Sequence, residues 1–146
     1  MSDIQARSIA ALLGLRPKSQ VFTSLDLAQE VGKGLSVHAI DRLCALIAPT
    51  EPGLRYQIVS KATLARRHKT VGQRLSREES DRLARLARLW AFAADVWGSE
   101  VAARRFLSEP HPLLGGRIPR QVATETEIGA RAVEELLGRL KYGSAA

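Results

Sequence analysis

The sequence has 146 residues, the length of one domain or two very small ones, and its 45% apolar and 25% charged residues exclude a disordered chain. Few aromatics favour helices over a β-sandwich or barrel, and a single cysteine excludes an internal disulfide framework. No membrane span or signal peptide is visible in the sequence, so we expect a cytoplasmic protein without a membrane partner.

The net charge of +7 is confined to one part of the chain. Residues 55–88 hold ten basic and three acidic residues, whereas residues 1–54 and residues 89–146 are each neutral. A local basic segment on an otherwise balanced protein indicates a polyanionic partner, most often nucleic acid. A solvated helix face would give the same pattern, so the segment needs a motif to support this interpretation.

Capping residues and apolar spacing predict helices along the whole chain, and no segment has the pattern of a strand. The expected helices, in chain order, cover residues 3–13, 25–31, 36–48, 60–68, 76–96, 100–107 and 125–141. Residues 50–58 are expected to form a connector, residues 110–119 an irregular segment and residues 120–123 a short turn. The predicted fold class is all-α, a compact multi-helix bundle.

Several of the predicted helices start with a capping signal. Ser36 is the candidate N-cap of helix 36–48, and Ser76 begins a capping box that ends at Glu79. Residues 124–127 offer a second capping box, with Thr124 as the N-cap of the last helix. Ser99 is expected to cap helix 100–107.

The two longest helices have predicted buried faces. In helix 76–96 and the residue after it, the apolar stripe consists of Leu83, Leu86, Ala87, Trp90, Ala93 and Trp97. Its arginines Arg77, Arg82, Arg85 and Arg88 lie largely off that stripe. In the last helix, the predicted apolar face consists of Ile128, Ala132, Leu136 and Leu140, widened by Val133 and Leu137.

Helix 36–48, the connector and helix 60–68 fit a helix-turn-helix with a lengthened turn. In that motif the second helix lies in the major groove, and its N-terminal residues reach base edges. We expect Ser60 to cap this helix, since a hydroxyl there can accept a backbone hydrogen bond. Bases would be contacted by Lys61, Thr63 and Arg66, and phosphates by Arg67 and Lys69.

Catalytic and metal-binding patterns are absent from the sequence. The three histidines have no ligand spacing, and the adjacent Glu134 and Glu135 diverge on a helix rather than forming an acid/base pair. Cys44 lies on an apolar stripe, which is typical of a buried thiol rather than a nucleophile. We therefore predict no enzyme and no cofactor.

Short motifs follow one another through the C-terminal half. They are Leu75–Leu83, Val96–Ser99, Phe106–Pro110, Leu113–Pro119, Thr126–Ala130 and Val133–Gly143. In this order and spacing they resemble the Xre/MbcA/ParS antitoxin family, and Val59–Arg67 resembles that family's Xre-like helix-turn-helix. The resemblance covers roughly residues 35–146 and places a DNA-binding domain at 1–74 and a toxin-binding domain at 75–146.

The resemblance implies the antitoxin of a type II pair, whose partner is a RES-domain toxin that consumes NAD⁺ or transfers ADP-ribose from it. The C-terminal region would cover the toxin's active site, and the helix-turn-helix would bind operator DNA and repress the chain's own operon. Carried over by position, the toxin-binding residues are Arg139, Leu140, Lys141, Tyr142 and Gly143. Operators of such motifs are usually inverted repeats, so a homodimer or a hetero-oligomer with toxin is expected.

A second hypothesis of another class remains open. The chain would be a stand-alone helix-turn-helix transcriptional regulator whose C-terminal domain dimerises or binds a small effector. This hypothesis explains the basic segment equally well, but it gives no role to the ending Lys141-Tyr142-Gly143.

Overall fold

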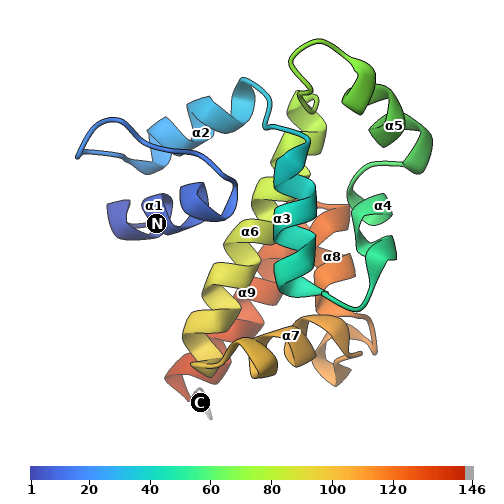
Figure 1. Cartoon of the computed structure of the whole chain (residues 1–146). Helices are drawn as coiled ribbons and strands as arrows, with labels where there is room; N and C mark the ends of the chain where they lie inside the picture. The colour runs from blue at the N-terminus through green and yellow to red at the C-terminus, as the bar shows by residue number, and fades with distance from the viewer. Residues whose placement is uncertain (144–146) are drawn as a thin grey trace. The chain divides into compact units, whose positions relative to one another are not determined.

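The structure is a computed structural model that describes residues 1–143, without the side chain of Ile4; residues 144–146 of the tail lie outside the described residues. Within residues 1–143 it contains nine α-helices, two 3-10 turns and no β-strand, which confirms the all-α class (Figure 1). The helices are α1 (Asp3–Leu12), α2 (Ser24–Gly32), α3 (His38–Ile47), α4 (Arg55–Ile58), α5 (Lys61–Lys69), α6 (Arg77–Trp97), α7 (Glu100–Ser108), α8 (Pro119–Glu125) and α9 (Glu127–Tyr142).

The chain divides into two compact units, Met1–Ala87 and Arg88–Ala146. The division falls inside α6, and this helix has buried side chains on both sides of it: Leu83 and Leu86 before it, Leu89 and Trp90 after it. The predicted domain boundary between residues 74 and 75 precedes α6, and it stays a prediction.

In the first unit, the predicted connector over residues 50–58 is wrong. Pro52–Leu54 form a 3-10 turn and Arg55–Ile58 form α4. Leu54 and Ile58, four residues apart, are 1% and 0% exposed, so a helical turn places both side chains in the core. The helix immediately before α5 is therefore α4, and the link between them is Val59 and Ser60.

The start of α3 also differs from the prediction. Val37 is its N-cap and makes no side-chain cap, so Ser36 is not the N-cap residue. The backbone of Ser36 instead pairs with Arg74 in an isolated antiparallel bridge, and the Leu75 amide donates to the Leu35 carbonyl at 2.8 Å. The Ser36 hydroxyl still accepts from the His38 amide at 3.3 Å, while its backbone pairs with the segment before α6.

The predicted capping box at the head of α6 is confirmed. The Glu79 amide donates to Ser76 Oγ at 3.1 Å, and the Ser76 amide donates to Glu79 Oε1 at 2.7 Å. Most of the predicted stripe is buried, except Trp97 at the end of the helix, which is 42% exposed. Arg85 is buried rather than off the stripe, and its guanidinium lies 3.5 Å from the carboxylate of Asp81.

In the second unit, the predicted turn at residues 120–123 belongs to the seven-residue helix α8. Thr124 lies inside α8 and is not an N-cap, since its hydroxyl donates to the Arg120 carbonyl at 3.0 Å. Thr126 is the N-cap of α9 and accepts from the Gly129 amide at 2.9 Å. The predicted cap of α7 by Ser99 is confirmed. The expected irregular segment before α8 contains one 3-10 turn, Pro112–Leu114.

The buried face of α9 is rotated from the predicted one. Its buried residues are Ala130, Val133, Leu136 and Leu137. By contrast, Ile128 is 80% exposed and Leu140 is 43% exposed, and Ala132 is exposed as well. The reason lies at Gly129, where an added Cβ would stand 2.2 Å from the Val122 carbonyl oxygen. Both the predicted and the observed face contain leucines, and this close backbone contact with α8 fixes the observed one.

Candidate functional site

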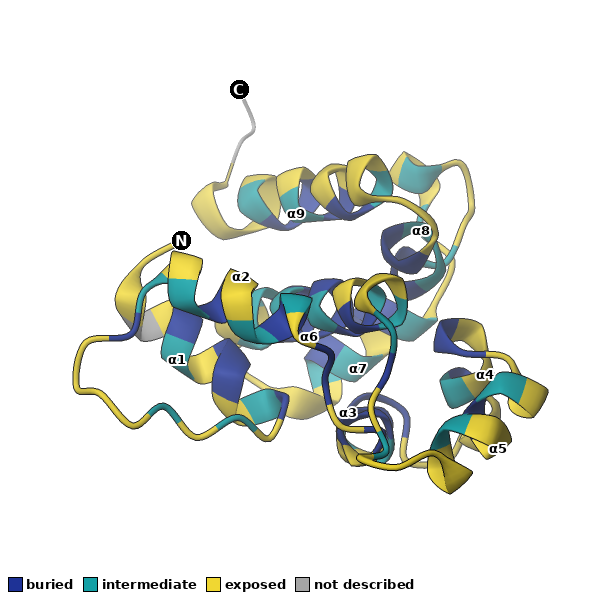
Figure 2. Cartoon of the chain, turned by 90° about the horizontal axis from the view of Figure 1, so that it is seen from above, coloured by how far each residue is buried: buried dark blue, intermediate teal, exposed yellow. Residues whose placement is uncertain are grey.

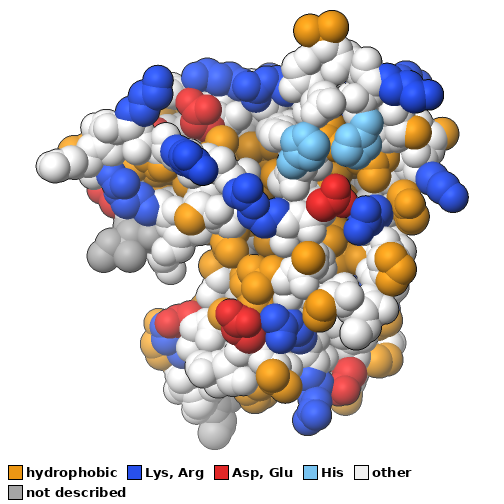
Figure 3. Space-filling view, viewed as in Figure 1, with side chains coloured by type: hydrophobic (Ala, Val, Ile, Leu, Met, Phe, Trp, Pro, Cys, Tyr) orange, Lys and Arg blue, Asp and Glu red, His pale blue; other side chains and the backbone are white. Residues whose placement is uncertain are grey.

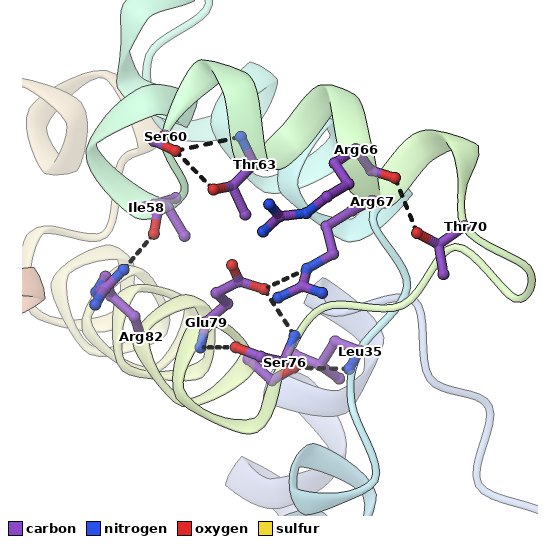
Figure 4. Close-up of polar contacts among 11 residues, drawn as sticks. Leu35, Ile58, Ser60, Thr63, Arg66, Arg67, Thr70, Ser76, Glu79 and Arg82 are labelled. Atoms are coloured by element: carbon purple, nitrogen blue, oxygen red, sulfur yellow. Dashed lines mark hydrogen bonds and ion pairs between the residues drawn. The ribbon is translucent and has the colours of Figure 1, made fainter.

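Helix α5 begins as the sequence predicts. Ser60 is its N-cap: its Oγ accepts from the Thr63 amide at 3.3 Å and donates to Thr63 Oγ1 at 2.8 Å (Figure 4). The preceding Val59 is extended and 3% exposed, so it anchors the turn that leads into the helix. The first backbone amides of α5 point out of the N-terminal end of the helix, where the helix itself offers them no acceptor.

Helix α5 presents nearly all of its surface to solvent. Of its nine residues, all of which the structure describes, only Leu64 is buried, and Figure 2 shows α5 mostly in the exposed and intermediate colours. Lys61, Arg66 and Lys69 are exposed, and Thr63 is half-buried. The last turn is basic, which suits the negative end of the helix dipole. Such a surface is available to a polyanion.

An ion pair fixes α5 to the start of α6. Arg67 Nε lies 3.1 Å from Glu79 Oε1, the same oxygen that accepts from the Ser76 amide (Figure 4). Partial burial acts to raise the pKa of Glu79, but hydrogen bonds from Ser76 and Arg67 outweigh it, so the pKa lies below its usual value. Arg67, predicted to bind phosphate, therefore also positions the helix.

Two further hydrogen bonds tie this region together. Arg82 on α6 donates to the Ile58 carbonyl at the end of α4, as Figure 4 shows. The Leu35 amide donates to the buried Ser80 hydroxyl at 2.8 Å. These contacts fix α4 and the segment before α3 to α6, next to α5.

The turn after α5 is built around Gln73, which sequence reasoning did not single out. Gln73 has a φ of 47°, and its carbonyl accepts from the Val37 amide at 2.9 Å. Its side chain lies 2.8 Å from His38 Nε2 and donates to the His68 carbonyl at 3.1 Å. The His38 and His68 ring centroids are 5.9 Å apart, and Figure 3 shows two adjoining histidine side chains. The signal in the sequence that could have located this turn is the neighbouring Gly72, which has a positive φ of 86°.

The C-terminal end of α9 brings the other predicted residues into one helical turn. The helix ends at Tyr142, and Gly143 is its left-handed C-cap with a φ of 59°. Tyr142 is 77% exposed, and Arg139 is exposed. Lys141 Nζ lies 2.6 Å from Asp95 Oδ2 on α6, and this hydrogen bond and charge raise the pKa of Lys141.

A row of ion pairs joins α9 to α6. Arg88 Nη2 lies 2.8 Å from Glu127 Oε1, and its Nε lies 2.6 Å from Glu134 Oε1. Burial acts to lower the pKa of Arg88, but these hydrogen bonds outweigh it and the pKa is raised. With Lys141 and Asp95, the row repeats every seven residues on both helices, a spacing that could have been found in the sequence.

A shallow hollow of about 500 Å³ adjoins this row. It is lined by Arg88, Phe92, Glu127, Arg131, Glu134 and Glu135. Charged groups of both signs surround a single aromatic ring, so the hollow suits a mixed protein surface better than a small apolar ligand.

Residues 1–143 lack two kinds of feature. No helix in that range is long and apolar enough to cross a membrane. The same residues contain no group of three His, Cys, Asp or Glu side chains placed to hold a metal ion.

Two family models match the two halves of the chain. Residues 26–88 match the antitoxin Xre-like helix-turn-helix domain, and residues 92–143 match the antitoxin Xre/MbcA/ParS C-terminal toxin-binding domain. The protein is therefore of the helix-turn-helix antitoxin class. Its helix α5 lies in the helix-turn-helix match, and its helix α9 lies in the toxin-binding match.

Similar curated proteins agree with this class. An antitoxin Xre of Yersinia enterocolitica is 38% identical over 120 residues, covering 80% of this chain and 79% of that protein. An antitoxin Xre of Pseudomonas putida is 38% identical over 103 residues, covering 67% of this chain and 64% of that protein. The chain belongs to the Xre antitoxin family.

Proposed function

We propose that this antitoxin neutralises a RES-domain toxin, one that consumes NAD⁺ or transfers ADP-ribose, by covering its active site with the C-terminal end of α9. The observation that carries this proposal is the contrast within α9: four residues anchor the helix, whereas Tyr142 at its end is 77% exposed. An exposed aromatic residue at a fixed position is typical of an interface anchor.

The chemistry of the last turn suits a pocket that binds a dinucleotide. Tyr142 offers a flat ring and a hydroxyl that can take the place of a planar base, and Arg139 is an exposed cation that can pair with carboxylates beside the pocket. Lys141 is already paired with Asp95, so its first role is to hold the turn in place. No group of this chain has to perform a reaction, and we propose that it is not an enzyme.

We also propose that α5 binds the operator of the chain's own operon in the cytoplasm and represses transcription. Ser60 caps the helix that would enter the groove, Lys61, Thr63 and Arg66 would face bases, and Lys69 would face phosphate. Operator symmetry makes a homodimer, or a hetero-oligomer with the toxin, the expected binding species.

The decisive experiment for neutralisation is a truncation. A chain ending at Gly138 should lose protection against the toxin encoded beside it while keeping its affinity for operator DNA. Growth, cellular NAD⁺ and operator binding are measured with the full chain, the truncated chain and no antitoxin. A fall in NAD⁺ that the full chain prevents identifies an NAD⁺-consuming toxin, whereas toxicity at constant NAD⁺ identifies ADP-ribosylation of a target.

Survival of neutralisation in the truncated chain would refute the role of the last turn. If induction of the neighbouring protein caused no toxicity at all, the chain would instead be a stand-alone regulator.

The proposed DNA contacts of α5 are tested by measuring how single substitutions change the base specificity and the salt dependence of binding. Arg66→Ala should relax discrimination at one base position, because a good bidentate contact contributes about 1–3 kcal/mol. Lys69→Ala should weaken binding to all sequences alike and lower the slope of affinity against salt by about 1. Fluorescence anisotropy with operator and scrambled duplexes measures both. Unchanged specificity and unchanged salt slope in these variants would remove α5 from the DNA interface.

A further inference from the structure

Helix α9 contains a glycine in its interior that the fold of this chain does not require. Gly138 lies four residues before the end of the helix. Glycine is the least favourable residue of a helix interior apart from proline, because it loses the most backbone freedom. Gly138 has no positive φ that would call for it. A glycine at this position therefore needs another reason.

The second glycine of the same helix shows what an internal reason looks like. At Gly129, an added Cβ would stand 2.2 Å from the Val122 carbonyl oxygen, so packing against α8 excludes a side chain. At Gly138, among the described residues, nothing outside the local helix backbone lies within 4 Å of an added Cβ. The space beside Gly138 is open in the free chain.

The position of Gly138 on the helix connects two features of the candidate site. It lies one turn after Glu134 and one turn before Lys141 and Tyr142, so it stands between the ion-pair row and the exposed end of the helix. The hollow that Arg88, Glu134 and Glu135 line lies on the same outward side. Two ion pairs with α6 fix this face of α9. Arg88 pairs with Glu134 before Gly138, and Asp95 pairs with Lys141 after it.

We infer that the toxin comes into direct van der Waals contact with the backbone of α9 at Gly138, and that a side chain here would hold the toxin away. The inference rests on the proposed function and extends the toxin contact beyond residues 139–143, along the outward face of the helix. The toxin is the occupant that the sequence supports, because residues 92–143 match a toxin-binding domain and Tyr142 follows on the same face.

Substitution of Gly138 tests this contact because stability and binding should change in opposite directions. Gly138→Ala should raise the melting temperature of the free chain by a few degrees, since alanine favours the helix. The same variant should bind the purified toxin roughly 10-fold more weakly, and Gly138→Leu more weakly still, as overpacking grows with size. Calorimetric melting and titration of the toxin with the full chain measure the two effects.

Two control variants separate this contact from general damage. Ala132→Leu adds a side chain at an exposed position of α9 that lies away from the Gly138 face, so it should leave toxin affinity unchanged. Gly129→Ala should lower the melting temperature, because its Cβ meets the Val122 carbonyl.

The outcomes distinguish this inference from the proposed function. A wild-type chain that binds toxin, together with Gly138→Ala and Gly138→Leu variants that bind equally well, would overturn the contact at Gly138 and leave the antitoxin function standing. A wild-type chain that binds no toxin would overturn both. A stabilised Gly138→Ala variant with weakened toxin binding would establish the contact.

Discussion

Helices α5 and α9 carry the two binding surfaces proposed above, and they differ in how they are held in the fold. Helix α5 has one buried residue, Leu64, and is fixed by polar contacts at its base, such as the pair between Arg67 and Glu79. Helix α9 has four buried residues and a row of ion pairs to α6. A helix that enters a DNA groove has to keep most of its surface exposed. A helix that contacts a partner protein through one face and its C-terminal end can bury its other faces.

The comparison predicts the largest effect at Leu64. Leu64→Ala truncates the one buried side chain of α5 and should cost about 2–5 kcal/mol, the range for buried leucines. Operator binding should be lost because the helix is no longer positioned, while toxin binding is retained. Urea unfolding and the two binding assays measure this.

A matched variant at Leu137 sharpens the result. Leu137→Ala removes a fully buried leucine from α9 and should reduce toxin affinity rather than operator affinity. If both variants impaired both activities equally, the independent anchoring of the two helices would be disproved.

A smaller effect is expected at Arg88. Arg88→Ala breaks the contacts to both Glu127 and Glu134, and we expect a loss of roughly 1–2 kcal/mol because the guanidinium is partly buried and hydrogen-bonded. Toxin affinity should fall, since α9 loses its alignment to α6, and operator affinity should not. Arg105→Ala is the control: its pair with Glu109 is exposed, and its removal should change little.

The smallest effect concerns pH and the base of α5. The folded pKa of Glu79 lies below its usual value of 4.5, so its stabilising contribution is complete above about pH 4.5 and is lost as the pH falls through the folded pKa. Glu79→Gln should cost roughly 1 kcal/mol at neutral pH and flatten the acid side of the stability curve. Unfolding followed between pH 3 and 7 measures this; an unaltered acid limb in the variant would contradict it.

The sequence predicted those parts of the fold that carry local signals. The capping box from Ser76 to Glu79 and the cap at Ser60 are interactions within one helical turn, so they are visible in a short stretch of sequence. Helices α4 and α8 were missed because each has only a turn or two, too short for a periodic pattern. The helical turns over residues 52–58 bury Leu54 and Ile58, and α8 buries Ala123 and Thr124.

The candidate site was predictable to a similar extent. The predicted end of the last helix at residue 141 is within one residue of its observed end at Tyr142, but the rotation of the helix depends on the contact of Gly129 with α8, which no periodicity reveals. The pair between Arg88 and Glu134 joins positions 46 residues apart. The seven-residue spacing of Glu134 and Lys141, and of Arg88 and Asp95, is visible in the sequence, but the sequence does not show that the two helices are neighbours.

The burial of Cys44 has a practical consequence for chemical labelling. It is the single cysteine of the sequence and is 3% exposed, so the native fold shields its sulfur from thiol reagents. A cysteine introduced on the surface, as in Lys69→Cys or Arg139→Cys, would then be the group that reacts under native conditions. Attaching a fluorophore or a photocrosslinker there would map operator and toxin contacts one at a time. The slower rate at which Cys44 itself reacts would measure how often α3 opens and exposes its sulfur.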